Sequence, residues 1–134
     1  DSSTEDLKTR VRELTGGGAD IVVDPVGGPL AESALRSLGN NGRYLVIGFA
    51  SGVIPSLPAN QILLRNRQVI GVDWGAWAMG NPADNATLLG EVIAAIEEGE
   101  ITPVEPQSYA LAEAGTALRD LLDRRLVGKA CLSS

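Results

Sequence analysis

The sequence contains no histidine and a single cysteine, Cys131, within its 134 residues. Histidine and cysteine are the usual protein ligands of structural zinc, so a Cys/His zinc site cannot be built from this chain. One cysteine also excludes a disulfide within the chain, and we expect a reducing compartment, the cytoplasm. We predict no bound metal, and we interpret Cys131 as a small apolar filler.

Positive charge and long hydrophobic runs are also scarce. Lys and Arg number 11 against 17 Asp and Glu, a formal net charge of −6, which argues against a nucleic-acid partner because phosphate backbones require clustered basic residues. The apolar stretch Ile62–Leu64 ends at Arg65, and we expect no membrane span and no signal peptide. With 44% hydrophobic and 21% charged residues, the composition is that of a globular domain.

Strand patterns alternate with helical patterns along most of the chain. Three β-branched runs lack period-two alternation, which is typical of strands buried on both faces of a parallel sheet; they are Ala19–Asp24, Arg43–Ile47 and Gln68–Trp74. Apolar periodicity predicts helices over residues 4–15, 29–38, Ala59–Arg65, Ala83–Glu98 and Ala112–Arg125. Such alternation predicts βαβ units with right-handed crossovers, so the expected fold class is α/β.

Capping signals set the ends of the first helices. Ser3 and Asp6 have the spacing of a capping box, and Gly16–Gly18 provide a left-handed end to the first helix. Pro29 favours the start of the second helix, and Gly39 favours its end.

The last third of the chain changes character. Two prolines interrupt Ile101–Leu111, so any strand there is short, bulged or at a sheet edge. Val127–Leu132 is predicted to be a closing strand after the last helix. The expected arrangement is an α+β segment that follows the parallel sheet.

Glycine-rich turns follow all three predicted strands. They are Val26-Gly27-Gly28, Gly48 to Gly52, and Gly75. Each alone fits an ordinary βα turn, but ligands of open α/β sheets bind beyond the carboxyl ends of the strands, so three together favour a cofactor edge. The sequence has neither G-x-G-x-x-G after a strand nor G-x-x-x-x-G-K-[ST], and we therefore expect no pyrophosphate cradle within this chain.

Other polar and aromatic residues have two interpretations each. Asp24 is either a general base or the cap of the following turn, and we favour the cap. Ser51 either donates to a ligand or closes a turn. Trp74 and Trp77 either line a ring-binding pocket or serve packing and interfaces. We interpret Lys129 as a solvated strand residue, and no catalytic triad or carboxylate pair is recognisable, so the catalytic residues are unknown.

Several motifs in the same order resemble one known family. Leu14 to Gly28, Gly42 to Gly52, Val69 to Gly75, and Gly128-Lys129 before an apolar strand are similar to the zinc-independent quinone oxidoreductases of the medium-chain dehydrogenase/reductase superfamily. The resemblance covers essentially all 134 residues. It implies the second half of a Rossmann-type parallel sheet of three βα units over residues 1–100, and a segment over residues 101–134 that returns to a substrate-binding domain.

The resemblance also implies a cofactor and an activity. Family members transfer a hydride from NADPH to a quinone or an activated alkene, and the cofactor carries the chemistry; the sequence leaves NAD open. Val26 and Gly27 are expected near the nicotinamide, and Val72 and Trp74 are expected to offer backbone groups to its carboxamide. The turn expected to wrap the nicotinamide ribose and ring is Gly48, Phe49, Ala50, Ser51 and Gly52.

The third predicted strand is also expected to be a sheet edge. Gln68–Trp74 is apolar and free of proline. An uncovered edge strand of this kind tends to pair with a strand of another chain, so we predict a homodimer through it. Because the family's phosphate loop has no counterpart here, we expect a fragment without autonomous activity. The alternatives are an inactive dimerisation or binding module that retains the half-sheet, and a subunit whose phosphate loop comes from another chain.

Overall fold

The computed structural model describes residues 4–134, and the chain divides into two compact units, Asp1–Met79 and Gly80–Ser134. The first unit is a three-stranded parallel sheet with strand order β1-β2-β3. Its strands are β1 (Ala19–Asp24), β2 (Leu38–Val46) and β3 (Gln68–Gly71). Its helices are α1 (Leu7–Thr15), α2 (Ala31–Ser37), α3 (Ala59–Leu63) and α4 (Trp74–Gly80). The α/β class and the parallel sheet predicted from the sequence are confirmed.

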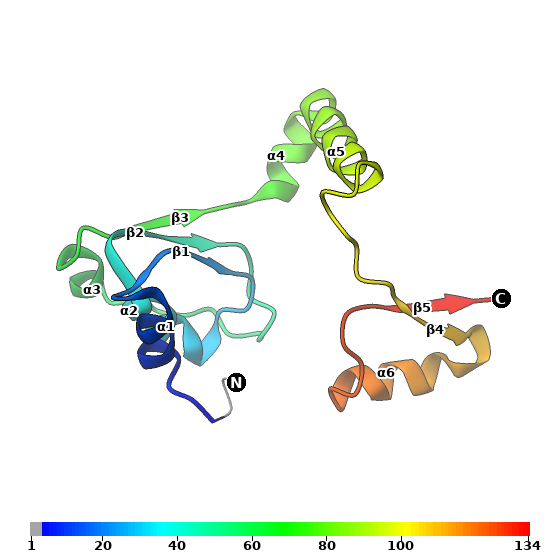
Figure 1. Cartoon of the computed structure of the whole chain (residues 1–134), viewed down its shortest axis with the longest axis horizontal. Coiled ribbons are helices and arrows are strands. Elements are labelled where there is room, and N and C mark those ends of the chain that lie inside the picture. Colours follow the sequence, from blue (N-terminus) through cyan, green and yellow to red (C-terminus); the bar gives the residue numbers. More distant parts are fainter. Residues whose placement is uncertain (1–3) are drawn as a thin grey trace. The chain divides into compact units, whose positions relative to one another are not determined.

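One face of this sheet is covered by helices, and the core lies beneath them. Figure 1 shows α1, α2 and α3 on the same face of the sheet. Tyr44 of β2 is fully buried there against Leu35 and Leu38, with Val22 of β1 beside them. The register Val22↔Tyr44↔Val69 places these three residues in one row across the strands.

The other face of the sheet is open, which corrects the prediction of strands buried on both faces. Ile21 and Val23 of β1 are 44% and 62% exposed, whereas Val22 between them is partly covered. The described residues supply one layer of helices, so alternate side chains of each strand face outwards. Both outer strands, β1 and β3, are sheet edges within the described part of the chain.

The start of the first helix and the end of the second differ from the predictions. The first helix begins at Leu7 rather than residue 4, because the Asp6 carboxylate accepts the backbone N–H of Thr9 at 2.9 Å and caps it; Ser3 of the predicted capping box lies outside the described residues. Gly16 does end α1, at φ +67°. Helix α2 ends at Ser37, before Gly39, because Leu38 already has extended backbone.

The third strand is shorter than predicted, and a helix follows it. Pairing with β2 ends at Gly71, although the N–H of Val72 still donates to the carbonyl of Val46 at 2.9 Å. The Asp73 carboxylate accepts the N–H of Ala76 at 2.9 Å, which stabilises a helix start in the manner of an N-cap. Trp74 therefore begins helix α4 instead of ending a strand.

The second unit contains one long helix and a small parallel pair of strands. Its elements are α5 (Pro82–Glu97), β4 (Gln107–Ala110), a 3₁₀ turn (Leu111–Glu113), α6 (Ala114–Leu122) and β5 (Ala130–Ser133). The predicted helix Ala83–Glu98 is confirmed within one residue, and the strand expected within Ile101–Leu111 is short, as its prolines require.

The core of the second unit is small. Tyr109, Ala117 and Leu126 are buried together, and the Tyr109 hydroxyl donates to the Asp120 carboxylate at 3.0 Å. Cys131 is exposed, so its interpretation as an apolar filler is wrong. Ala130, its neighbour on β5, is the residue that packs on this core, and successive strand residues face opposite sides.

Candidate functional site

The carboxyl ends of β1, β2 and β3 meet at one edge of the sheet because the strands are parallel. Asp24, at the end of β1, organises this edge. One of its carboxylate oxygens accepts the backbone N–H groups of Val26 and Gly27, both at 2.9 Å. The other accepts the hydroxyl of Tyr44 from β2. The favoured interpretation of Asp24 as a turn cap is confirmed.

Charge at this pair is set by the same contacts. Burial raises the pKa of Asp24, but the hydrogen bonds from Tyr44, Gly27 and Val26 outweigh it and leave that pKa below its ordinary value. Burial and the adjacent carboxylate raise the pKa of the Tyr44 hydroxyl. Asp24 therefore stays ionised and Tyr44 stays protonated near neutrality, so the pair is suited to holding the turn and not to general base catalysis.

The loops that follow β1 and β2 are joined by backbone hydrogen bonds. The N–H groups of Ala50 and Ser51 donate to the carbonyls of Pro25 and Val26, each at 3.0 Å. Ser51 also accepts the N–H of Val53 at 3.2 Å through its hydroxyl, which is the turn-closing interpretation of this residue. The N–H of Gly52 donates to the carbonyl of Phe49 at 2.8 Å and that of Gly48 to the carbonyl of Asp24 at 3.4 Å, so four of the five residues expected to wrap the ribose have their amides engaged in holding the loops.

Gly27 lies at a tight point between these loops. Its φ is +65° and its ψ is −144°, a region that is open essentially to glycine alone. A Cβ at this position would lie 3.0 Å from Phe49 Cδ1 and 3.1 Å from the carbonyl oxygen of Val53. Glycine is therefore required at this position, since both the backbone angles and the available space exclude a side chain.

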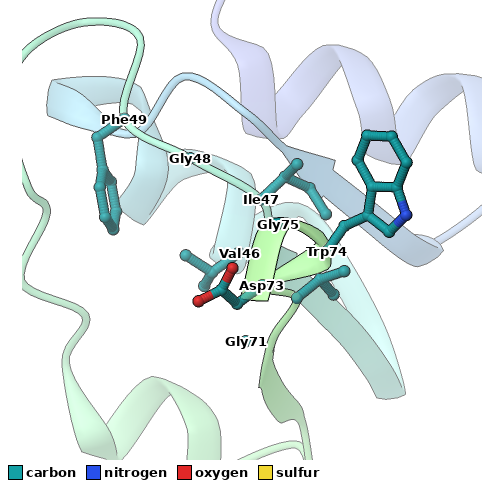
Figure 2. A pocket seen from close by; sticks show the side chains of 9 residues that line it. Val46, Ile47, Gly48, Phe49, Gly71, Asp73, Trp74 and Gly75 are labelled. Carbon is teal, nitrogen blue, oxygen red and sulfur yellow. The ribbon is translucent and has the colours of Figure 1, made fainter. Parts of the chain in front are cut away.

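An open groove of about 590 Å³ runs along the carboxyl ends of β2 and β3 (Figure 2). Nine residues line it: Val46, Ile47, Gly48, Phe49, Gly71, Val72, Asp73, Trp74 and Gly75. Figure 2 shows the Phe49 ring and the Trp74 indole pointing away from each other, with Asp73 between them in this view. Phe49 is 41% exposed and Trp74 is 53% exposed, so both present apolar surface at the groove.

The structure brings only part of the predicted cofactor set to this groove. Four predicted residues line it: Gly48, Phe49, Val72 and Trp74. Val26 and Gly27 line a separate, more apolar cavity of about 350 Å³ beside β1. Ala50, Ser51 and Gly52 line neither of these two cavities.

Two features of the groove modify the expected backbone contacts. The N–H of Val72 is already donated to Val46, so only its carbonyl is left to offer. Trp74 is the first residue of α4, and its N–H is one of the groups that a helix start leaves without an intrahelical partner. The contact predicted from Trp74 therefore reduces to a single donor.

Five lining residues of the groove were outside the predicted cofactor set, although Gly75 was predicted to lie on the same edge. They are Val46, Ile47, Gly71, Asp73 and Gly75. Gly71 is the informative one, because a Cβ there would meet nothing within 4 Å. The available signal was a glycine inside the predicted strand Gln68–Trp74, because glycine within a strand often marks a close backbone approach.

The described residues offer no metal site. Residues 4–134 contain no group of three or more Cys, Asp or Glu side chains that could hold an ion together, and the chain has no histidine. No helix in this part of the chain is long and apolar enough to cross a bilayer.

Comparisons with known proteins match this architecture. A family model described as zinc-binding dehydrogenase matches residues 1–132. Quinone oxidoreductase-like protein 2 of Bos taurus is 38% identical over 128 residues, which are 95% of this chain and 37% of that protein.

Solved structures of the same kind superpose on the whole chain. A quinone oxidoreductase from Pseudomonas syringae has a TM-score of 0.81 at 28% identity, over 100% of this chain and 42% of that one. A mycobacterial protein in complex with NADPH has a TM-score of 0.78 at 28% identity, over 96% of this chain and 39% of that one. The chain thus spans roughly two fifths of these relatives. Together with the fold, these matches show that the chain belongs to the zinc-binding dehydrogenase family of the medium-chain dehydrogenase/reductase superfamily, and that it is quinone oxidoreductase-like.

Proposed function

We propose that this chain forms the nicotinamide end of an NADP(H) site in an oxidoreductase that transfers a hydride to a quinone or an activated alkene. The observation that carries the proposal is the open groove at the carboxyl ends of β2 and β3, where a parallel α/β sheet binds its ligands. The relative in complex with NADPH supports the phosphorylated cofactor. NAD(H) is the alternative cofactor, because no residue of the groove distinguishes the two cofactors by the extra phosphate that NADP(H) carries on its adenosine ribose.

The groove has the surfaces that a flat, partly apolar ring requires. Gly48 and Gly71 leave the backbone open to close approach, while Phe49 and Trp74 supply apolar area. The Val72 carbonyl and the Trp74 N–H form an acceptor and donor pair, which is what a carboxamide binds. We propose as the cofactor-binding set Val26, Gly27, Gly48, Phe49, Ala50, Ser51, Gly52, Val72 and Trp74.

The bound cofactor supplies the hydride, and the residues of this chain bind and orient it. Asp73 is the single ionisable side chain among the nine that line the groove. Its carboxylate is occupied by the N–H of Ala76, so we assign it the role of starting α4 and no proton transfer. Zinc has no suitable donor cluster among the described residues, and no step is assigned to it.

Titration of the purified protein with NADPH tests the proposal. Trp74 and Trp77 are the two tryptophans of the chain, and we expect NADPH to quench their fluorescence with saturation. Gly71→Val places a branched side chain in open space at the groove, so it should fold normally and weaken binding by about tenfold or more.

Gly90→Ala is the matched control for this titration. A Cβ at Gly90 also meets nothing within 4 Å, but the residue lies on α5 and lines none of the described cavities. We expect its affinity for NADPH to equal that of the wild type. Absence of saturable quenching up to millimolar NADPH would overturn the proposal and favour the alternative of a dimerisation or binding module.

We further propose that the protein is a homodimer through the edge of the sheet at β3. All four residues of β3 are exposed, with Val69 at 39% and Ile70 at 38%. An edge of this kind pairs readily with a second copy. Ile70→Lys should shift light-scattering mass toward the monomer, whereas Leu122→Lys, at an 82% exposed position of α6, should not. A monodisperse monomer for the wild type would contradict the proposal.

The remaining assignments follow from the same resemblance. We propose that residues 1–100 belong to the dinucleotide-binding domain and that residues 101–134 return to a substrate domain. A reducing cytoplasm suits the exposed thiol of Cys131. Limited proteolysis of the purified chain that cleaved near residue 80, with no cleavage near residue 100, would contradict this boundary.

A further inference from the structure

A second cavity lies at the opposite ends of the strands from the cofactor groove. It has a volume of about 360 Å³ and is bounded by α1, α2, α3 and the amino ends of β2 and β3. Its cationic lining is Lys8, Arg12, Arg36, Arg65 and Arg67, and no acidic residue lines it. Five of the 11 basic residues of a chain with net charge −6 thus line one small cavity.

Arg67 lies deepest in this cluster and has a structural task. It is 6% exposed, and its guanidinium donates to the carbonyls of Leu38 at 2.6 Å and Gln61 at 2.8 Å. These bonds join the end of α2 to α3. They leave the Nε of Arg67 buried and without a hydrogen-bond partner among residues 4–134.

The other basic residues of the cavity do not share the structural role of Arg67. The Nε of Arg12 is also buried without a partner in the described part of the chain. Buried donors without acceptors are rare and costly. Arg65 donates only to the Asn40 side chain, at 3.3 Å, and residues 4–134 provide no ion pair within 4.0 Å for Lys8, Arg12, Arg65 or Arg67.

Mutual repulsion follows from this arrangement. Burial lowers the pKa of Arg67, and the charges of Arg65, Arg12 and Arg36 lower it further. Arg36 has an acidic neighbour, Glu32, at 3.3 Å, but on an exposed helix surface where such a pair contributes little. A concave site that collects positive charge and unsatisfied N–H donors is complementary to an anion.

We propose that this cavity binds a phosphate-type oxyanion, either free phosphate or the phosphate group of a small metabolite. Guanidinium groups match tetrahedral oxyanions with paired N–H donors, and the four arginines here come from three different segments: α1, α2 and the turn between α3 and β3. The volume suits a small molecule, while the acidic chain as a whole disfavours a nucleic acid. The inference does not depend on the proposed oxidoreductase function, because the two sites lie at opposite strand ends.

Isothermal titration of the purified protein with inorganic phosphate, and separately with glycerol 3-phosphate, tests the proposal. We expect saturable binding at constant ionic strength. The double variant Arg12→Gln/Arg65→Gln should weaken it by about tenfold or more. The control Arg43→Gln/Arg119→Gln removes the same charge at exposed positions outside the cavity and should bind like the wild type.

The two ligands separate the two sources of the anion. Tighter binding of glycerol 3-phosphate assigns the cavity to a phosphorylated metabolite, and equal or weaker binding assigns it to free phosphate. Equal affinity of the double variant and the wild type would overturn the proposal. A second readout is the melting temperature, which phosphate should raise more in the wild type than in the double variant at equal ionic strength, because phosphate also stabilises proteins without binding a site; an equal rise in both would also overturn the proposal.

Discussion

Gly27 is predicted to be the most costly glycine of the cofactor edge to replace. Its φ of +65° and ψ of −144° cost an L-residue about 1–3 kcal/mol. A Cβ would also lie 3.0 Å from Phe49 Cδ1, 3.1 Å from the Val53 carbonyl oxygen and 3.2 Å from Pro55 Cδ. Because a backbone carbonyl and a proline ring move little, overpacking adds about 1–3 kcal/mol. We expect Gly27→Ala to lower the free energy of unfolding by roughly 2–6 kcal/mol.

Two other glycines separate the cost of backbone strain from the cost of overpacking. Gly52 has φ +77°, but a Cβ there would meet no atom within 4 Å, so Gly52→Ala should cost only the backbone term, about 1 kcal/mol. Gly71→Ala has neither problem and should leave stability unchanged or raise it by up to about 1 kcal/mol. Urea unfolding followed by tryptophan fluorescence measures all three. Equal losses for Gly27→Ala and Gly52→Ala would refute the argument from crowding.

Two further predictions concern the first unit. Hydrogen bonds hold the pKa of Asp24 in the folded protein below 3.8, so its contribution to stability is present above that pH and is lost as the pH falls through the lower folded pKa. Asp24→Asn should therefore lower the free energy of unfolding by about 1–3 kcal/mol at neutral pH and make stability depend less on pH in acid. An unchanged loss of stability in acid would contradict this. Leu35 is fully buried, so Leu35→Ala should lower the free energy of unfolding in urea by about 2–5 kcal/mol. Leu14 is 69% exposed, and Leu14→Ala should lower it by less than about 1 kcal/mol. Equal losses for the two variants would show that the core lies elsewhere.

The parallel sheet could be predicted from the sequence because its strands are short β-branched runs separated by helical periodicity. The burial of those strands could not. A run such as Ile21-Val22-Val23 has no polar alternation, yet the described helices cover only the face of Val22. The composition of a strand shows that both of its faces are apolar. It does not show which other residues pack on each face.

Helix α4 shows a second limit. The glycine at 75 and the tryptophan at 74 have no helical pattern of their own, and the helix start depends on the Asp73 carboxylate meeting the N–H of Ala76. An aspartate directly before a helix is a recognisable N-cap signal. The β-branched run before Asp73 nevertheless led to a predicted strand that continues to Trp74, beyond the observed end at Gly71. Local capping overrode strand propensity here.

The site was predicted as an edge but not in its details. Glycine after each strand indicated the edge of the sheet at which the groove lies, since turns and close backbone approach both need glycine. Which turn residues face the groove depends on long-range pairing, in particular the bonds from Ala50 and Ser51 to Pro25 and Val26. The contact between these loops spans about 25 residues of sequence and leaves no periodic signature.

The end of β1 has a dynamic consequence. The carbonyl of Asp24 accepts the N–H of Ile47 at 2.9 Å, while its carboxylate holds Val26 and Gly27. One residue therefore secures amides on both loops, and neither loop can open without releasing the other. In hydrogen exchange the amides of Val26, Gly27 and Ile47 should lose protection together, as one cooperative opening with a single free energy.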